Sequence, residues 1–267
     1  MEAKNHRSVT DQMGREIRLP WPPRRIISLV PSQTELLYHL GLEEQVVGIT
    51  KFCVHPPHWR KQKTLVGGTK TLHPELIRQL QPDLIIGNKE ENEQQAIESL
   101  ATEFPVWMSD IACLEDALEM MRRVGEITGR AEASEKLVSE VIRAFAALPA
   151  MESRSALYLI WRKPWMGVGH STFIHQMLTL IGLRNVLEDQ ARYPELSEAE
   201  LQRLNPEVVL LSSEPYPFQE KHLAELQALL PQSRLLLVDG ELFSWYGSRL
   251  LQAPAYFKEL QQELLGK

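Results

Sequence analysis

The chain has 267 residues and a formal net charge of -6, from 29 lysines and arginines against 35 aspartates and glutamates. This length corresponds to about two domains, or one large one. No apolar run reaches the roughly 20 residues that a transmembrane helix needs, so membrane insertion is not expected. The mild acidity argues against a nucleic-acid partner, and two cysteines, Cys53 and Cys113, cannot make a disulfide-rich scaffold.

The residues from Met1 to Arg7 contain no apolar core and no small-residue cleavage site after one. As written, the chain therefore carries no secretory signal. It is then either cytosolic or a sequence that begins after a removed signal.

The first part of the chain predicts short buried strands that alternate with helices. After the first strand, Ser32 and Glu35 have the spacing of a capping box, and a helix is expected to run from there to Gly41. Strands are predicted at residues 25–30, 46–49, 83–86 and 106–108. Short apolar runs separated by helices indicate a parallel sheet covered on both faces.

Two amphipathic helices follow in the middle, at residues 114–124 and 131–148. The second would be about 27 Å long at about 1.5 Å per residue. The alternation then restarts, with strands predicted at 156–160, 208–211 and 235–238 and helices at 173–181, 198–204, 220–229 and 254–265.

The two halves of the chain echo each other. Residues 80–86 match residues 204–210: a helix ends in leucine, a proline breaks it, an acid follows, and an apolar strand begins. We therefore expect an α/β lobe over residues 1–112, linking helices over 113–150, and a second α/β lobe over 151–267. A ligand is expected in a cleft between the lobes, at the carboxyl ends of the strands.

Three loop segments of the first lobe are candidate ligand contacts. Residues 31–34, with Ser32, form a helix N-terminus that is either a plain cap or a polar edge for a ligand. Residues 67–70, with Thr69, are either a flexible turn or a loop whose backbone approaches a ligand. The loop 50–59 holds Cys53, His55 and His58; metal binding there is possible in principle, but an aromatic lining through Phe52 is favoured because the spacing fits no standard zinc motif.

In the second lobe, large rings and one histidine follow strands or precede helices. Base rates would bury such rings, whereas their loop positions favour a broad apolar ligand face. These residues are Trp161, Trp165, His170, Tyr193, Trp245 and Tyr246.

Acidic residues gather after matching strands of the two lobes. Glu90, Glu91 and Glu93 lie in the first lobe, and Glu214 and Glu220 in the second. They form either a solvated charged face or two acidic patches that dock onto a basic partner. No nucleophile elbow, HExxH or Walker motif is present, although a catalytic histidine can be assembled in space.

Five motifs resemble the substrate-binding proteins of bacterial ABC importers for vitamin B12 and iron–siderophore complexes, and most closely the cobalamin-binding periplasmic type. The similarity covers nearly the whole chain from about Val9. Its most specific part is residues 23–35, Pro-Arg-Arg-Ile-Ile-Ser-Leu-Val-Pro-Ser-Gln-Thr-Glu; residues 9–16, 67–69, 80–85 and 243–247 also fit.

The resemblance implies a class III periplasmic binding fold, in which two lobes are joined by a rigid backbone helix. It implies a corrinoid or ferric siderophore as bound ligand, with no catalytic cofactor and no enzymatic reaction. Phe52 in the first lobe, and Trp165, Tyr193 and Trp245 in the second, correspond to lining positions. Asn88 is polar where vitamin B12 binders can carry an aromatic residue, so the ligand can differ from cobalamin.

The resemblance further implies a monomer that docks onto an ABC permease. One glutamate at each lobe tip, Glu93 and Glu220, would pair with permease arginines, with Glu91 or Glu214 as alternatives. The expected location is the periplasm or the cell surface; exported relatives carry a signal peptide, which is not visible here.

Two other functions remain open on the same architecture. One is a metal chelatase that uses His55, His58 or His170 to accept protons from a ring nitrogen. The other is a cytosolic corrinoid carrier that hands its ligand to another protein.

Overall fold

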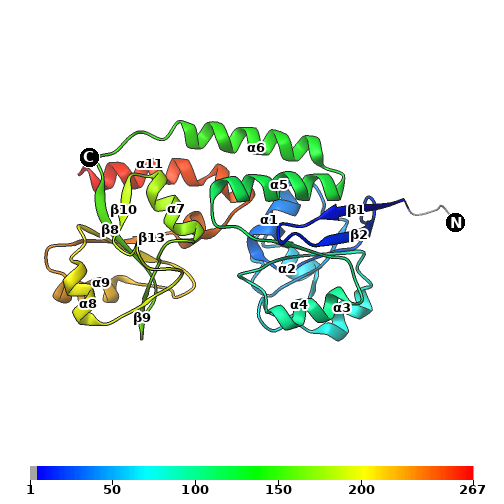
Figure 1. Ribbon diagram of the computed structural model, residues 1–267, viewed down its shortest axis with the longest axis horizontal. Helices are drawn as coiled ribbons and strands as arrows, with labels where there is room; N and C mark the ends of the chain where they lie inside the picture. The colour runs from blue at the N-terminus through cyan, green and yellow to red at the C-terminus, as the bar shows by residue number, and fades with distance from the viewer. Residues whose placement is uncertain (1–4, 267) are drawn as a thin grey trace. The chain divides into compact units, whose positions relative to one another are not determined.

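The structure, a computed structural model, describes residues 5–266 and divides into two compact α/β units (Figure 1). Unit 1 comprises residues 5–111, 115–142 and 246–249. Unit 2 comprises residues 112–114, 143–245 and 250–266. The division therefore falls inside the second of the two middle helices, and a short C-terminal segment that the sequence suggested for the second lobe belongs to unit 1.

Unit 1 begins with an antiparallel hairpin of β1 (His6–Thr10) and β2 (Glu16–Pro20). Its turn is held by Asp11, whose carboxylate accepts hydrogen bonds from the backbone nitrogens of Met13 and Arg15 at 3.0 and 2.8 Å. The Arg15 guanidinium pairs with the same carboxylate at 2.6 Å. This short side chain therefore closes the turn locally, as aspartate commonly does.

The sheet of unit 1 has five parallel strands in the order β5-β4-β3-β6-β7. The strands are β3 (Ile26–Ser28), β4 (Val46–Ile49), β5 (Thr64–Leu65), β6 (Leu84–Asn88) and β7 (Val106–Ser109). The helices between them are α1 (Pro31–His39), α2 (Trp59–Gln62), α3 (Pro74–Leu80) and α4 (Gln94–Ala101). The predicted parallel sheet and its four predicted strands are confirmed.

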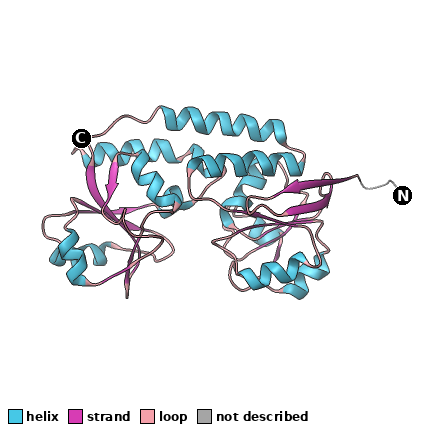
Figure 2. Ribbon diagram, in the orientation of Figure 1, coloured by secondary structure: helices cyan, strands magenta, loops and turns pink. Residues whose placement is uncertain are grey.

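Helices cover both faces of this sheet (Figure 2). Ile77 of α3 and Ile97 of α4 pack with Ile27 and Ile85 in one core cluster, so α3 and α4 lie on one face. In Figure 1, α1 and α5 (Leu114–Thr128) lie on the other side of the sheet from α3 and α4. Because both faces are buried, each strand is a continuous apolar run rather than an alternating one.

The predicted capping box at the start of α1 is wrong. The helix begins one residue earlier, at Pro31, with Val30 as its N-cap and no side-chain cap. Proline favours the first helical position because its missing N–H is not needed there. Ser32 is thus inside the first turn, and Glu35 instead binds Arg249 with contacts of 2.9 and 3.0 Å.

The helices α5 and α6 (Ala131–Ala146) approach each other closely in unit 1 at Gly125. A Cβ built on Gly125 would lie 2.3 Å from the Cβ of Ser134. The Ser134 hydroxyl donates to the carbonyl of Met121 at 2.6 Å, which ties α6 to the backbone of α5. Glycine at this position therefore sets the distance between the two helices.

The sheet of unit 2 is mixed, in the order β11-β9-β8-β12-β13, with β10 also paired to β8. The strands β8 (Arg154–Trp161), β12 (Val208–Ser212) and β13 (Arg234–Val238) run parallel, as expected. The strand β10 (Leu183–Asn185), which the sequence did not predict, pairs in parallel with β8. The short strands β9 (Trp165–Gly167) and β11 (Glu195–Leu196) are antiparallel additions that the sequence did not predict.

The helices of unit 2 also flank their sheet. They are α7 (Phe173–Leu180), α8 (Glu198–Leu204), α9 (Glu220–Leu229), α10 (Gly240–Ser244), the 3-10 turn η1 (Ser248–Leu251), which unit 1 shares, and α11 (Ala253–Leu264). Leu201 of α8 and Leu226 of α9 pack against Leu157 and Val209 of the sheet. On the other face, Tyr158 contacts Phe243 of α10 at 5.1 Å between ring centroids.

Candidate functional site

The carboxyl ends of β3, β6 and β7 in unit 1 carry a buried polar network. The Gln33 amide nitrogen donates to the Ser109 hydroxyl at 2.6 Å and to the Gly87 carbonyl at 3.3 Å. Asn88 donates to the same hydroxyl at 2.9 Å. These hydrogen bonds hold the start of α1 onto the ends of two strands.

Asn92 extends this network to the glycine-containing loop. Its side-chain oxygen accepts from the Asn88 backbone nitrogen at 2.9 Å, and its amide nitrogen donates to the Thr69 carbonyl at 3.0 Å. A Cβ at Gly87 would lie 2.6 Å from that oxygen, so only glycine leaves room for it. The backbone at Thr69 is therefore held by a hydrogen bond and is not a free turn.

Phe52 lies at the carboxyl end of β4 and exposes 51% of its surface. The next residue, Cys53, is fully buried, with its sulfur 3.0 Å from the Thr34 hydroxyl and 3.2 Å from the Thr50 hydroxyl. The ring itself lies against Gly68, where an added Cβ would come within 3.1 Å of it. The Phe52 ring is thus exposed on a loop that the contacts of buried Cys53 hold in place.

Ser32 and Asn88 are both buried, with 4% and 2% of their surfaces exposed. The Asn88 side-chain oxygen accepts from the backbone nitrogens of Glu90 and Glu91 at 2.9 and 3.1 Å. Asn88 therefore shapes its own loop, and its side chain does not take the place of an exposed aromatic residue.

The loop of Cys53, His55 and His58 does not form a metal cluster. Burial raises the pKa of the Cys53 thiol, which keeps it neutral, and His58 contacts Glu43 at 3.3 Å. Within residues 5–266, no group of three or more histidine, cysteine, aspartate or glutamate side chains is placed to hold a metal ion. Cys53 and Cys113 do not form a disulfide.

At the carboxyl end of β12 in unit 2, Glu214 organises the neighbouring segments. Its carboxylate accepts from the Ser244 hydroxyl at 2.6 Å and from the Trp245 indole nitrogen at 2.9 Å. A Cβ at Gly240 would meet the Glu214 Cγ at 2.6 Å. Glu214, an alternative docking acid from the sequence, is therefore engaged inside unit 2.

An aromatic cluster covers the ends of β8 and β9. Trp165 stacks on Phe218 at 6.2 Å with an interplanar angle of 3°, and Tyr216 contacts both Phe218 at 4.8 Å and Trp161 at 5.6 Å. Trp161 exposes 40% of its surface, whereas Trp165 exposes only 7%. Trp161 is thus the exposed ring of this cluster, whereas Trp165 is buried against Phe218.

His222 of α9 is buried beside the aromatic cluster. Its Nδ1 accepts from the Gln219 backbone nitrogen at 2.9 Å, and its Nε2 lies 3.2 Å from the Tyr216 hydroxyl. Burial, together with the positive charges of Lys221 and Arg162, lowers the pKa of His222. The folded protein therefore favours the neutral imidazole, which alone can accept at Nδ1.

We expect the stability to fall in mild acid because of His222. A lowered folded-state pKa means that the unfolded chain binds the proton more tightly, so the effect is absent well above pH 6.5 and grows as the pH drops below about 6.5. One proton contributes at most about 1.4 kcal/mol per pH unit.

Urea unfolding between pH 7 and pH 5 measures this effect. The free energy of unfolding should fall less steeply with pH for His222→Gln than for the wild type. The control His39→Gln, at an exposed histidine, should match the wild type. Parallel curves for His222→Gln and the wild type would contradict this assignment.

His170 and Tyr193 lie on paired segments of unit 2. His170 bridges to Ala191, and the Arg192 backbone nitrogen donates to the His170 carbonyl at 3.0 Å. The His170 ring nitrogen Nδ1 lies 2.8 Å from the Ser171 hydroxyl. Tyr193 is half-buried, with the Arg192 guanidinium 5.8 Å from its ring centroid.

Trp245 and Tyr246 are both 7% exposed and belong to different units. Trp245 is held by Glu214 in unit 2, whereas Tyr246 lies in unit 1 with the segment that Arg249 anchors to Glu35. Both side chains are therefore buried, and neither forms part of an exposed apolar face.

The two predicted docking acids start matching helices. Glu93 is the N-cap of α4 and accepts from the backbone nitrogens of Gln95 and Ala96 at 3.2 and 2.7 Å. Glu220 is the first residue of α9. Both are exposed, and both follow corresponding strands, β6 and β12. Each carboxylate is also favoured there by the partial positive charge of a helix N-terminus.

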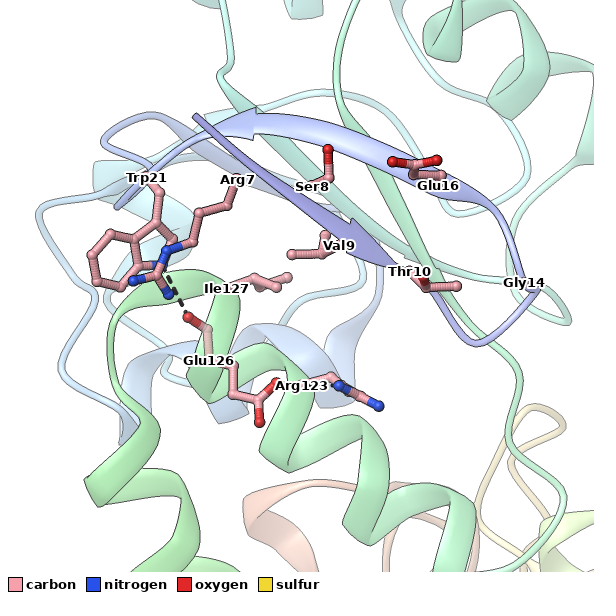
Figure 3. A pocket seen from close by; sticks show the side chains of 10 residues that line it. All are labelled: Arg7, Ser8, Val9, Thr10, Gly14, Glu16, Trp21, Arg123, Glu126 and Ile127. Carbon is pink, nitrogen blue, oxygen red and sulfur yellow. Dashed lines mark hydrogen bonds and ion pairs between the residues drawn. The ribbon is translucent and has the colours of Figure 1, made fainter. Parts of the chain in front are cut away.

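A pocket of about 700 Å³ lies elsewhere, between the β1–β2 hairpin and α5 (Figure 3). The Arg7 guanidinium stacks over the Trp21 ring at 3.2 Å, and the Trp21 nitrogen donates to the Glu126 carbonyl at 3.1 Å. None of the sequence-predicted site residues lines it, and its lining carries two arginines and two glutamates. This balance of charge gives no preference for an anion or a cation.

The chain belongs to the periplasmic binding protein family, whose model matches residues 26–231. A vitamin B12-binding protein of Pectobacterium carotovorum is 26% identical over 242 residues, covering 86% of each chain. A substrate-binding lipoprotein of an ABC transporter in Bacillus subtilis is 24% identical and covers 92% of this chain and 82% of its own. The periplasmic vitamin B12-binding protein BtuF of Vibrio cholerae has a TM-score of 0.76 at 20% identity, covering 92% of this chain and 99% of its own.

These similarities confirm the fold class and the family that the sequence motifs indicated. They give no support to the chelatase alternative. Among residues 5–266, no helix combines the length and apolarity that crossing a membrane requires.

Sequence reasoning missed several residues that build these two sites. Gln33 and Ser109 could have been suspected because they follow strands, where ligand loops gather. Lys51 lies beside Phe52 but was not singled out. Tyr216, Phe218 and His222 carry no spacing signal, because their cluster forms only when β9 and α9 pack together.

Proposed function

We propose that the protein is the substrate-binding component of an ABC importer and captures a flat metal complex of the corrinoid type. The observation that carries the proposal is the half-exposed Phe52 ring, presented at the carboxyl end of a parallel sheet by a loop anchored through buried Cys53. Trp161 offers a second exposed ring in unit 2. The names of the Pectobacterium and Bacillus relatives support the ligand class and the transport role.

Capture of this kind relies on apolar burial with few polar constraints. A ligand face that buries about 300 Å² of apolar area gains about 7 kcal/mol at about 25 cal/mol per Å², before association costs. The anchored loops reduce those costs because little ordering is lost on binding. Micromolar or tighter binding follows without any chemical reaction.

The proposal includes all the ligand contacts that the sequence predicted, but it gives exposed and buried residues different roles. In unit 1, Phe52 offers an exposed ring face and Thr69 presents backbone at a hydrogen-bonded loop. In unit 2, Trp161 offers an exposed ring face. Other residues complete the site through partly exposed atoms or by supporting these contacts: Ser32, Trp165, His170, Tyr193, Trp245 and Tyr246.

Titration of the purified protein tests this function. Cyanocobalamin, hemin and a ferric hydroxamate siderophore are each added while heat and the ligand's visible spectrum are recorded. We expect saturable binding of at least one of them, accompanied by a spectral shift. If none produces heat or a spectral change, the proposed function is rejected.

We further propose that Glu93 and Glu220 dock the protein, as a monomer outside the cytoplasmic membrane, onto arginines of the importer's permease. Their exposed positions at the starts of matching helices support this role. Because Glu93 also caps α4, its removal by alanine would cost about 1 kcal/mol of stability. Glutamine keeps an acceptor oxygen and removes the charge, so it separates docking from folding.

The double variant Glu93→Gln/Glu220→Gln is expected to bind ligand normally but to stimulate ATP hydrolysis by the reconstituted importer at least about 10-fold less, since two charge pairs are lost. Glu132→Gln/Glu198→Gln, with the same charge change at exposed helix starts, serves as the control. Normal stimulation by the double docking variant would rule out the docking assignment.

A further inference from the structure

The loops that follow β4, β5 and β6 form what is here called the rim of unit 1, and they carry three lysines, Lys51, Lys70 and Lys89. Two of these lysines are already partnered. The Lys70 ammonium donates to the Glu90 carbonyl at 2.5 Å, and the Lys89 ammonium pairs with the Asp110 carboxylate at 2.5 Å. The third, Lys51, lies two residues after the end of β4 and precedes Phe52. Within the described part of the chain its ammonium has no carboxylate partner, and it is the uncompensated cation of this rim.

Lys51 is placed where a ligand stacked on Phe52 would meet it. Its ammonium lies 5.1 Å from the Phe52 ring centroid, and its backbone nitrogen donates to the Gly67 carbonyl at 2.8 Å. The side chain is exposed, and its stem passes Gly68, where an added Cβ would lie 3.4 Å from Cε. The backbone is thus fixed while the flexible stem lets the charge follow a substituent of the ligand.

We propose that Lys51 binds an anionic substituent of the macrocycle that stacks on Phe52, and so selects ligands that carry one. This inference rests on the proposed function. The chain has a formal net charge of -6, which disfavours an anionic ligand at long range. A local unpaired ammonium offsets that repulsion at the point of contact, and its position beside the ring ties the charge to the orientation of the stacked face.

Two kinds of macrocycle supply the same chemistry. A complete corrinoid carries a phosphodiester, and an iron tetrapyrrole carries carboxylates. Each has a counterpart without the negative charge: dicyanocobinamide lacks the phosphodiester together with the rest of the nucleotide loop, and hemin dimethyl ester lacks free carboxylates. Comparing the wild type with a Lys51 variant on both members of each pair therefore separates the contribution of the anion from that of the flat face and also tells the two sources apart.

The test compares the wild type with Lys51→Gln against cyanocobalamin, dicyanocobinamide, hemin and hemin dimethyl ester. We expect Lys51→Gln to weaken binding of the anionic member of the bound pair by about 3- to 10-fold, as for a partly exposed ion pair. Its affinity for the uncharged member should be unchanged. Lys51→Arg should retain the wild-type preference, and Lys136→Gln, at an exposed position of α6, should behave as the wild type.

The dependence on salt gives an independent readout. The wild-type affinity for the anionic ligand should fall between 50 and 500 mM salt, and Lys51→Gln should reduce that fall. Equal affinities of Lys51→Gln and wild type for the anionic ligand, or equal losses for charged and uncharged members, would overturn the role of Lys51 while the proposed function stands. Failure of the wild type to bind any of the four macrocycles would overturn both.

Discussion

Replacing Phe52 by alanine is expected to weaken ligand binding by about 10- to 100-fold, or about 1.4 to 2.8 kcal/mol, as for the truncation of an aromatic anchor. The ring is 51% exposed, so the free protein loses little packing when it is removed. We therefore expect the free energy of unfolding to change by less than about 0.5 kcal/mol. Calorimetric titration and urea unfolding of the same samples measure the two effects.

Met13→Ala is the matched control for this experiment. Met13 is also a large apolar side chain of unit 1 and is 42% exposed, but it lies in the hairpin turn rather than at the end of β4. Its truncation should change neither the affinity nor the stability measurably. An unaltered affinity in Phe52→Ala, or a loss that Met13→Ala reproduces, would show that the ligand does not stack on this ring.

Replacing Gly125 by leucine is expected to lower the free energy of unfolding by about 3 kcal/mol or more. Even one added carbon would lie 2.3 Å from the Ser134 Cβ, which is attached to backbone and cannot rotate away. The helices α5 and α6 must then separate, which strains the packing and breaks the hydrogen bond from Ser134 to the Met121 carbonyl. The better helix propensity of leucine returns only about 1 kcal/mol.

Urea unfolding followed by circular dichroism measures this effect. Glu119→Leu, on an exposed position of the same helix, should change stability by less than about 1 kcal/mol, because its ion pair with Arg123 is on the surface. The pair Gly125→Ala/Ser134→Gly should recover part of the stability that Gly125→Ala alone loses. A Gly125→Leu protein that unfolds at the wild-type urea concentration would show that the two helices do not depend on this close approach.

Much of the fold was accessible from the sequence because local patterns and tertiary burial agree. The predicted helices 198–204 and 220–229 coincide with α8 and α9, and the predicted strand 46–49 coincides with β4. The strands β9 and β11 were missed because runs of three and two residues are too short to establish a period. The capping box at Ser32 was wrong because Pro31 is itself suited to the first helical position.

The candidate sites were less accessible than the fold. Loop position after a strand was sufficient to select Phe52, and the structure exposes its ring. The same reasoning selected Trp165 and Trp245, which are 7% exposed because Phe218 stacks on one and Glu214 binds the other. Whether a ring after a strand faces out or in depends on what arrives from distant parts of the chain.

The amino-acid order alone established the repeated α/β pattern, the family motifs and the absence of a long apolar span, since all three depend on neighbours within one element. Tertiary structure alone decided which groups are partnered. Arg249 meets Glu35 across 214 positions and Gln33 meets Ser109 across 76, whereas Lys51 meets no carboxylate among residues 5–266. Partnering of charged and polar groups is a property of contacts between remote segments, and these contacts form only when the chain has folded.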